Sequence, residues 1–232
     1  MCHDRGDRCV ASVLAESGTS RESAADMQVS VEAYLVKWSD QLESDASLMS
    51  LPDDLPRPKD DGAAAHLPGT AMPITRLAST DGTTVHLSDL PPGRTVIFVY
   101  PRTGRPSRAL PEGWDAIPGA RGCTPQMCSI RDSIEDLRGA GVVAVFGLSA
   151  QDTAYQSEAV RRLRLPFPLL ADPTLSVRAA LRLPTFEVSG LTVYRRLTLV
   201  VQDGVIEKAF YPVFPPDSHV RAVISWLRSR RR

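Results

Sequence analysis

The stretch GARGCTPQMCSIRD, residues 119–132, places two cysteines five positions apart at the start of a predicted helix. This spacing fits neither a Cys-x-x-Cys redox pair nor a zinc ribbon. A cysteine at a helix N-terminus ionises readily, because unpaired backbone N–H groups and the helix dipole favour negative charge. Cys123, with Arg121 and Arg131 close by in sequence, is therefore predicted to be a thiolate nucleophile.

The position of Cys128 predicts a conformational change. On an intact α-helix, a five-residue step separates two Cα atoms by about 8 to 9 Å, whereas a disulfide needs them within roughly 7 Å. A sulfenic acid formed at Cys123 can therefore be captured by Cys128 only after the first turn or two of the helix unwinds. We hypothesise a two-state site, ordered for oxidation and locally opened for disulfide formation.

The segments on either side of this stretch alternate between strand and helix patterns. Asp-Gly pairs at 81–82 and 203–204 each predict a tight turn between two strands. Hairpins are expected over 74–90 and 195–212, and strands over 94–101, 142–149 and 167–172. Helices are expected from 123 to the glycines at 139 and 141 and over 153–165, 173–183 and 217–232. In the third of these helices, Asp172 is the expected cap and Pro173 the first residue. This order predicts an α/β fold, a three-layer sandwich whose central mixed sheet is flanked by helices.

The length of 232 residues suits one ordinary domain with an appendage. Residues 1–51 are predicted to be an acidic N-terminal extension, partly helical or disordered, with one amphipathic helix within 29–49. Residues 52–66 form a Pro/Asp/Gly linker, and the domain is expected over 67–232. Within it, residues 102–122 form an insert without periodicity, and such long irregular stretches tend to be functional or mobile.

The residue composition and the charge of the chain argue against several classes of partner. The chain carries 27 basic and 27 acidic residues, so its charge implies no nucleic-acid partner. No apolar window approaches the roughly 18 residues of a membrane span, and no signal peptide is apparent, so we expect a cytoplasmic protein without a membrane partner. The histidines supply no ligand pair, and Cys2, Cys9 and His3 lie in the acidic terminus, so no metal site is expected.

The motif GCTPQMCSIRD resembles the active-site segment of peroxiredoxins of the AhpC/TSA (redoxin) family. It is most similar to the Q-type, bacterioferritin-comigratory-protein-like branch, whose pattern is G-C-T-x-x-x-C-x-[FL]-R-D. Further similar blocks follow in matching order from about Leu67 to Leu227: VIFVYP (96–101), VFGLSAQD (145–152), LPFPLLAD (165–172) and RRLTLVVQDG (195–204).

The resemblance implies a thioredoxin-like fold and a thiol-dependent peroxidase that needs no cofactor. Cys123 corresponds to the peroxidatic cysteine, which becomes a sulfenic acid, and Cys128 to the resolving cysteine. Arg196 resembles the arginine that steadies the thiolate and polarises the peroxide, with Arg195 as the neighbouring candidate. Because strand residues alternate between faces, only one of the two arginines is expected to point at the cysteine. The implied partners are a peroxide and a reductant, thioredoxin or a glutaredoxin. A resolving cysteine in the same helix removes the need for a dimer, so a monomer or weak dimer is expected.

One departure from the family concerns the peroxide pocket. The family places a threonine three residues before the peroxidatic cysteine and a proline seven before it, where this chain has Ala120 and Ala116. Pro101 and Thr103 precede the insert instead. Either the insert loops out, so that Pro101 and Thr103 still close the pocket, or the peroxide site has been rebuilt.

Two other functions stay open on the sequence. The first is a thiol–disulfide oxidoreductase on the same fold, which would reduce protein disulfides and ignore peroxide. The second is a non-catalytic redox-sensing interaction module, in which the N-terminal helix or the basic tail meets a partner and Cys123 acts as a switch. Within the insert, Trp114 is predicted either to cover the pocket or to anchor the packing.

Overall fold

The computed structural model describes residues 51–52, 54–106 and 108–230. The chain divides into two compact units, residues 1–42 and 43–232, and the first lies wholly outside the described part. The predicted amphipathic helix within 29–49 and the cysteines at positions 2 and 9 therefore also lie outside it. The described linker residues, 52 and 54–66, contain no helix or strand, and the boundary of the domain at residue 67 stays a prediction.

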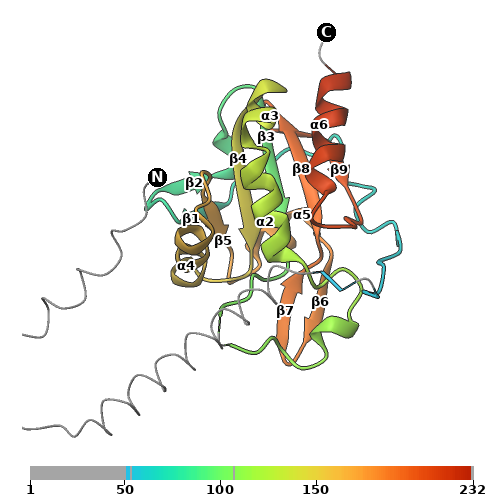
Figure 1. Cartoon of the computed structure of the whole chain (residues 1–232). Helices are drawn as coiled ribbons and strands as arrows, with labels where there is room; N and C mark the ends of the chain where they lie inside the picture. Colours follow the sequence, from blue (N-terminus) through green and yellow to red (C-terminus); the bar gives the residue numbers. More distant parts are fainter. Residues whose placement is uncertain (1–50, 53, 107, 231–232) are drawn as a thin grey trace, which may run out of the picture. The chain divides into compact units, whose positions relative to one another are not determined.

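A seven-stranded mixed sheet forms the centre of the described domain (Figure 1). The strand order is β2-β1-β5-β4-β3-β8-β9, in which β3, β4 and β5 run parallel and the other neighbours antiparallel. A separate hairpin is made by β6 and β7. The strands are β1 (Arg76–Ser79), β2 (Thr84–His86), β3 (Arg94–Val99), β4 (Val142–Ser149), β5 (Leu169–Ala171), β6 (Thr185–Val188), β7 (Leu191–Tyr194), β8 (Leu197–Gln202) and β9 (Val205–Phe210).

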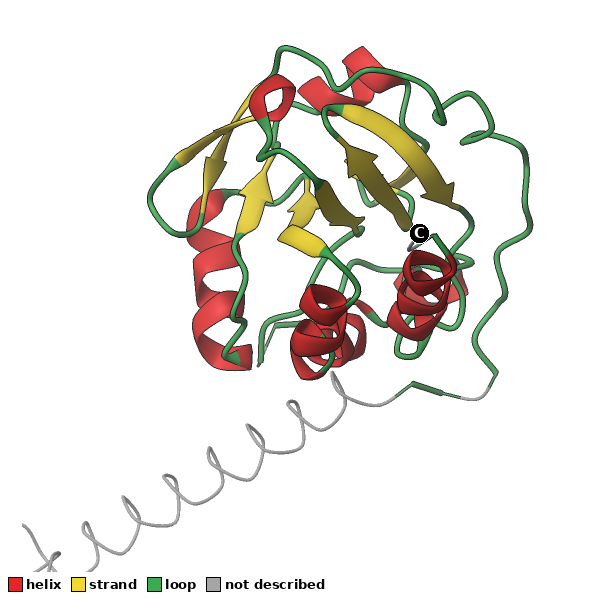
Figure 2. Ribbon diagram, turned by 90° about the horizontal axis from the view of Figure 1, so that it is seen from above, coloured by secondary structure: helices red, strands yellow, loops and turns green. Residues whose placement is uncertain are grey.

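Helices cover both faces of the sheet (Figure 2). On one face lie α2 (Cys123–Asp132), α3 (Ile134–Gly139), α4 (Thr153–Leu163) and α6 (His219–Ser229); on the other lie α5 (Ser176–Leu181) and the 3-10 helix η1 (Leu87–Asp89). The central strand β3 serves both apolar clusters, because its residues alternate between faces: Phe98 joins the first and Val99 the second. Within the described part of the chain, no helix is long and apolar enough to cross a membrane.

The structure confirms the mixed α/β sandwich and both predicted Asp-Gly turns. Asp203 and Gly204 both have positive φ, 48° and 79°, which is the backbone of a two-residue turn whose twist suits a hairpin. This turn links the end of β8 to the start of β9, and β8 pairs antiparallel with the central strand β3, with Leu197 opposite Val99. This pairing brings the start of β8, and Arg196 just before it, to the end of β3.

Two predicted helices differ from those observed. The helix from residue 123 to the glycines is divided at Ser133, whose φ and ψ of −108° and 12° end α2 before α3 begins. Serine is a weak former of helix interiors, because its hydroxyl competes for nearby backbone groups. The helix over 173–183 was predicted to begin at Pro173 but begins at Ser176. Asp172 still caps it, by accepting hydrogen bonds from the backbone N–H groups of Ser176 and Val177 at 2.8 Å.

The β6–β7 hairpin was not predicted, and it supplies the surface on which the insert packs. The hairpin turns at Ser189 and Gly190, both with positive φ. Its Phe186 packs against Trp114 with ring centroids 5.8 Å apart, and Trp114 is 2% exposed. Trp114 belongs to the short 3-10 helix η2 (Trp114–Ala116) within the insert, so it is a packing anchor for an otherwise irregular loop.

Candidate active site

Cys123 is the first residue of α2 and is only 3% exposed. Two donors from distant parts of the chain lie at hydrogen-bond distance of its sulfur. The backbone N–H of Arg102, at the end of β3, is 3.4 Å away, and Nη2 of Arg196, at the start of β8, is 3.2 Å away. The thiol also faces the carbonyl of Ala120 at 3.7 Å. The Cys123 sulfur thus has two hydrogen-bond donors, one of them cationic.

Several hydrogen-bond acceptors hold the buried Arg196 guanidinium beside the Cys123 sulfur. The residue is 3% exposed, and its Nη2 also lies at hydrogen-bond distance of the carbonyl oxygens of Gly119, Ala120 and Arg121, at 3.3, 3.1 and 3.0 Å. Its Nη1 donates to the side-chain oxygen of Gln126, one turn into α2. All these acceptors are neutral, so Cys123 is the one described partner of this guanidinium whose side chain could carry a negative charge.

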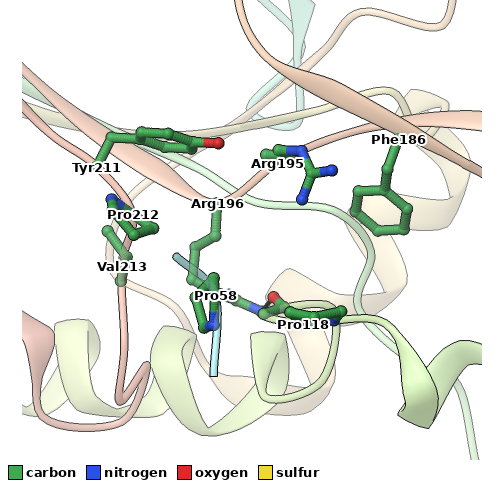
Figure 3. Close-up of a pocket in the computed structure, with 9 residues that line it drawn as sticks. Pro58, Pro118, Phe186, Arg195, Arg196, Tyr211, Pro212 and Val213 are labelled. Atoms are coloured by element: carbon green, nitrogen blue, oxygen red, sulfur yellow. Dashed lines mark hydrogen bonds between the residues drawn. The ribbon is translucent and has the colours of Figure 1, made fainter. Parts of the chain in front are cut away.

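The choice between the two neighbouring arginines is settled by their opposite directions. Arg195 extends toward the ring of Phe186, with its guanidinium carbon 5.8 Å from the ring centroid, whereas Arg196 runs past Pro58 (Figure 3). This divergence is the alternation expected of extended backbone. The structure thus brings Arg196 and Cys123 together and places Arg195 against the β6 strand.

The structure places Pro101 and Thr103 at the end of β3, before the insert, and whether they close a peroxide pocket stays a prediction. Pro101 and Thr103 are both buried beside the end of β3, and the intervening Arg102 reaches the sulfur through its backbone. The Thr103 hydroxyl, however, donates to the side-chain oxygen of Gln151 at 3.1 Å, and it is not among the described hydrogen-bond partners of the sulfur. Gln151 also accepts from the Thr103 backbone N–H at 2.9 Å. Thr103 therefore holds the end of β3 through Gln151. The described hydrogen-bond donor to the Cys123 sulfur from this segment is the backbone N–H of Arg102.

Cys128 is buried in the same helix and is 6% exposed. Burial raises the pKa of the Cys128 thiol, against the opposing effect of the Arg131 guanidinium. Because α2 is continuous from residue 123 to 132, the two Cα atoms are about 8 to 9 Å apart by helix geometry, beyond the reach of a disulfide. In this conformation burial thus favours the protonated Cys128 thiol, and Cys123 and Cys128 do not form a disulfide.

Sequence reasoning missed Gln126, which binds Arg196, and His219, whose pKa the Arg196 charge affects. Gln126 stands three positions after Cys123, so helical spacing alone could have placed it on the same face. His219, the first residue of α6, lies within hydrogen-bond distance of the Thr198 hydroxyl at 2.9 Å. Burial, with a smaller effect from the Arg196 charge, lowers the pKa of His219 to about 4. No local signal could have found this contact, since it joins residues on separate elements.

The comparisons with known proteins agree on one family. The family model described as Redoxin matches residues 67–224. Peroxiredoxin Q from Oryza sativa subsp. japonica, a chloroplast protein, is 30% identical over 161 residues, which cover 69% of this chain and 66% of the relative. The chloroplast peroxiredoxin Q from Populus jackii is 29% identical, with 69% and 68% covered. The chain therefore spans just under two thirds of the rice relative.

Two solved structures with the same fold come from bacteria. Peroxidoxin BcpB from Mycobacterium tuberculosis superimposes with a TM-score of 0.57 at 24% identity, over 72% of this chain and 100% of that one. Peroxiredoxin Q from Xanthomonas campestris gives a TM-score of 0.53 at 18% identity, over 76% and 98%. At these identities the likeness establishes the fold, a thioredoxin-like sandwich.

Proposed function

The chain belongs to the Redoxin family, and on that premise we propose that it is a thiol-dependent peroxidase that reduces hydrogen peroxide or organic hydroperoxides through Cys123. The observation that carries the proposal is the 3.2 Å contact between the Cys123 sulfur and the buried guanidinium of Arg196. The peroxiredoxin Q relatives from rice and poplar support the same reaction class.

In the first step, the Cys123 thiolate attacks the terminal oxygen of the peroxide. An S–O bond forms while the O–O bond breaks, so sulfur is oxidised to a sulfenic acid. The departing oxygen takes up the proton that the Cys123 thiol released, and the peroxide is thereby reduced to an alcohol or water. Arg196 and the backbone N–H of Arg102 lie where negative charge moves from sulfur to the departing oxygen. Donors fixed in advance in this way stabilise a transition state without further reorganisation.

In the second step, the thiol of Cys128 attacks the sulfenic acid. An S–S bond forms, the S–O bond breaks, and the hydroxyl leaves as water with the thiol proton. Because the folded helix holds the two cysteines apart, its first turns unwind before this step. Unwinding also removes Cys128 from the burial that raises its pKa, and so makes it a better nucleophile.

A dithiol protein then reduces the disulfide by exchange and returns both cysteines to thiols. Thioredoxin or a glutaredoxin is the reductant that suits the family. Both cysteines lie in one helix, so the cycle needs one chain only, which favours a monomer or weak dimer. We propose the cytoplasm as the location, from the sequence alone.

Trapping of the first intermediate tests the proposal. The Cys128→Ser variant, treated with one equivalent of hydrogen peroxide and then with dimedone, should carry a single adduct that peptide mass spectrometry assigns to Cys123. The variant that combines Cys123→Ser with Cys128→Ser should carry no such adduct. Absence of the adduct from Cys128→Ser would exclude the proposed first step.

One observation favours a second candidate, a thiol–disulfide oxidoreductase. The Thr103 hydroxyl is bound to Gln151 and so is not presented to the sulfur. An assay of insulin reduction beside an assay of peroxide consumption separates the two, because the peroxidase should act on peroxide alone. Consumption of only one equivalent of peroxide per chain, with thioredoxin and its reductase present, would instead favour a redox-sensing module.

A further inference from the structure

Residues 51–61, referred to here as the strap, lie outside the part of the chain that matches the family. The match begins at residue 67, and these residues belong to the segment predicted to be a linker. The structure describes all of them except residue 53. They contact residues 118–122, referred to here as the cysteine loop, which leads directly into Cys123.

The strap touches the cysteine loop at two glycines. A Cβ atom placed on Gly122 would lie 2.8 Å from Cδ2 of Leu51 and 2.5 Å from Cγ of Pro216. One placed on Gly119 would lie 3.3 Å from Cγ of Pro58. Gly122 and Gly119 have φ of 98° and 76°, so both the backbone conformation and the contact require glycine there. The strap thus packs directly on the backbone of the cysteine loop.

Two further contacts join the strap to the domain. The Arg57 guanidinium lies over the ring of Phe214 at 5.6 Å, and the Asp61 carboxylate lies close enough to the Tyr211 hydroxyl to add to the effect of burial in raising the pKa of Tyr211. Figure 3 shows Pro58 with Pro118 and Tyr211 around the hollow that Arg196 also lines. The strap is therefore held at several points along the segment that ends at the active site.

The cysteine loop, on which the strap packs, takes part in both chemical steps, but in different ways. The carbonyl oxygens of Gly119, Ala120 and Arg121 accept from Arg196, so the shape of the cysteine loop fixes the guanidinium against the sulfur. Gly122 precedes the first turn of α2, which must unwind for the disulfide. Any movement of Gly122 toward the strap is blocked by the Leu51 side chain and by Pro216.

We propose that the strap clamps the cysteine loop and the first turn of α2, with Leu51 and Pro58 as positioning residues that favour oxidation of Cys123 and slow its disulfide with Cys128. The effect of the strap on the reaction rests on the proposed function. Its effect on the local stability of α2 does not. The reaction that it slows is the second step already written: the S–S bond forms as the S–O bond breaks and water leaves.

Hydrogen exchange of the reduced, full-length protein tests the clamp without any peroxide. In Leu51→Ala and Pro58→Ala, amides of the peptide that covers α2 should exchange about fivefold faster than in the unsubstituted protein, because the open state of α2 is populated more. Amides of α4 should be unaffected. The matched control is Pro68→Ala, which alters an exposed proline near the same segment and should leave α2 unchanged.

The rate of disulfide formation between Cys123 and Cys128 supplies the second measurement. Diamide, a thiol oxidant that accepts two electrons and two protons, should close the disulfide several-fold faster in both strap variants than in Pro68→Ala. Exchange in α2 at the unsubstituted rate in both variants would overturn the proposal, and so would equal acceleration in α4, which would mean general destabilisation. Neither readout depends on peroxidase activity, so a failure of the proposed function would appear separately, as absence of sulfenic acid in the unsubstituted protein.

Discussion

Nη2 of Arg196 lies 3.2 Å from the sulfur of Cys123, across 73 positions of sequence. The antiparallel pairing of β8 with β3 brings the two residues together, since it carries the start of β8 to the end of β3, opposite the first turn of α2. The guanidinium is buried and its other described acceptors are neutral. Its position therefore depends on the fold, and its charge is directed to one atom.

Replacement of Arg196 should slow the first step. In Arg196→Lys, the ammonium group cannot bind Gln126 and the sulfur together as the planar guanidinium does, so the second-order rate of Cys123 oxidation should fall about 100-fold. Stopped-flow fluorescence with hydrogen peroxide measures this rate. The control is Arg195→Lys, whose guanidinium lies against Phe186, and its rate should stay within about twofold. Equal losses in the two variants would show that the charge acts generally and that no directed contact is involved.

Replacement of Cys128 should separate the two steps. Cys128→Ser should form the sulfenic acid at about the unsubstituted rate, because Cys128 lies five residues along α2, with its Cα about 8 to 9 Å from that of Cys123 by helix geometry. Steady-state turnover with thioredoxin should be lost, since no 123–128 disulfide can form. Peptide mapping after one equivalent of peroxide should find that disulfide in the unsubstituted protein. Undiminished turnover of Cys128→Ser would exclude Cys128 as the resolving cysteine.

Removal of the Thr103 hydroxyl should affect stability more than chemistry. Thr103→Val leaves the side-chain oxygen of Gln151 without one of its donors in a buried site, so the free energy of unfolding should fall by about 1 to 2 kcal/mol. Because the hydroxyl faces Gln151, the rate of Cys123 oxidation should change by less than about threefold. Thr103→Ser should restore the stability. A 100-fold loss of rate in Thr103→Val would place the hydroxyl at the peroxide after all.

Protonation of His219 should make stability depend on pH below neutrality. Its pKa is lowered to about 4 in the folded protein, against about 6.5 when unfolded, so the unfolded chain binds more protons between these values. The free energy of unfolding should therefore decrease as the pH falls from about 6.5 to about 4, by as much as ~3 kcal/mol. Urea titrations at several pH values measure it.

A matched pair of variants isolates this contribution. His219→Gln retains a side chain able to bond Thr198 but cannot take up the proton, so its pH dependence over this range should be flatter. His86→Gln alters an exposed imidazole and should keep the original dependence. The interpretation fails if both variants follow the same curve as the unsubstituted protein.

The sequence was informative wherever a feature is set by local residues. Asp203-Gly204 predicts its own turn, the apolar run 96–99 predicts a strand buried on both faces, and the glycine before Cys123 precedes the start of α2. The motif also predicted which cysteine begins the helix. These properties depend on neighbours within a few positions, so a single sequence contains them.

Features that join distant segments could not be predicted in the same way. The direction of Arg196 was left open against Arg195, because alternation specifies that the two differ but gives no absolute face. The binding of Thr103 to Gln151 and of His219 to Thr198 each joins separate elements. The strap shows the same difference, since prolines predicted the lack of helix and strand there but could not predict its contact with Gly119 and Gly122.

The central claim is most directly tested by steady-state consumption of hydrogen peroxide, with thioredoxin, its reductase and NADPH, by the unsubstituted protein and by Cys123→Ser. The account predicts many turnovers per chain for the first, none for the second, and at most one equivalent consumed when thioredoxin is omitted. Unchanged turnover in Cys123→Ser, or no consumption by the unsubstituted protein, would contradict it.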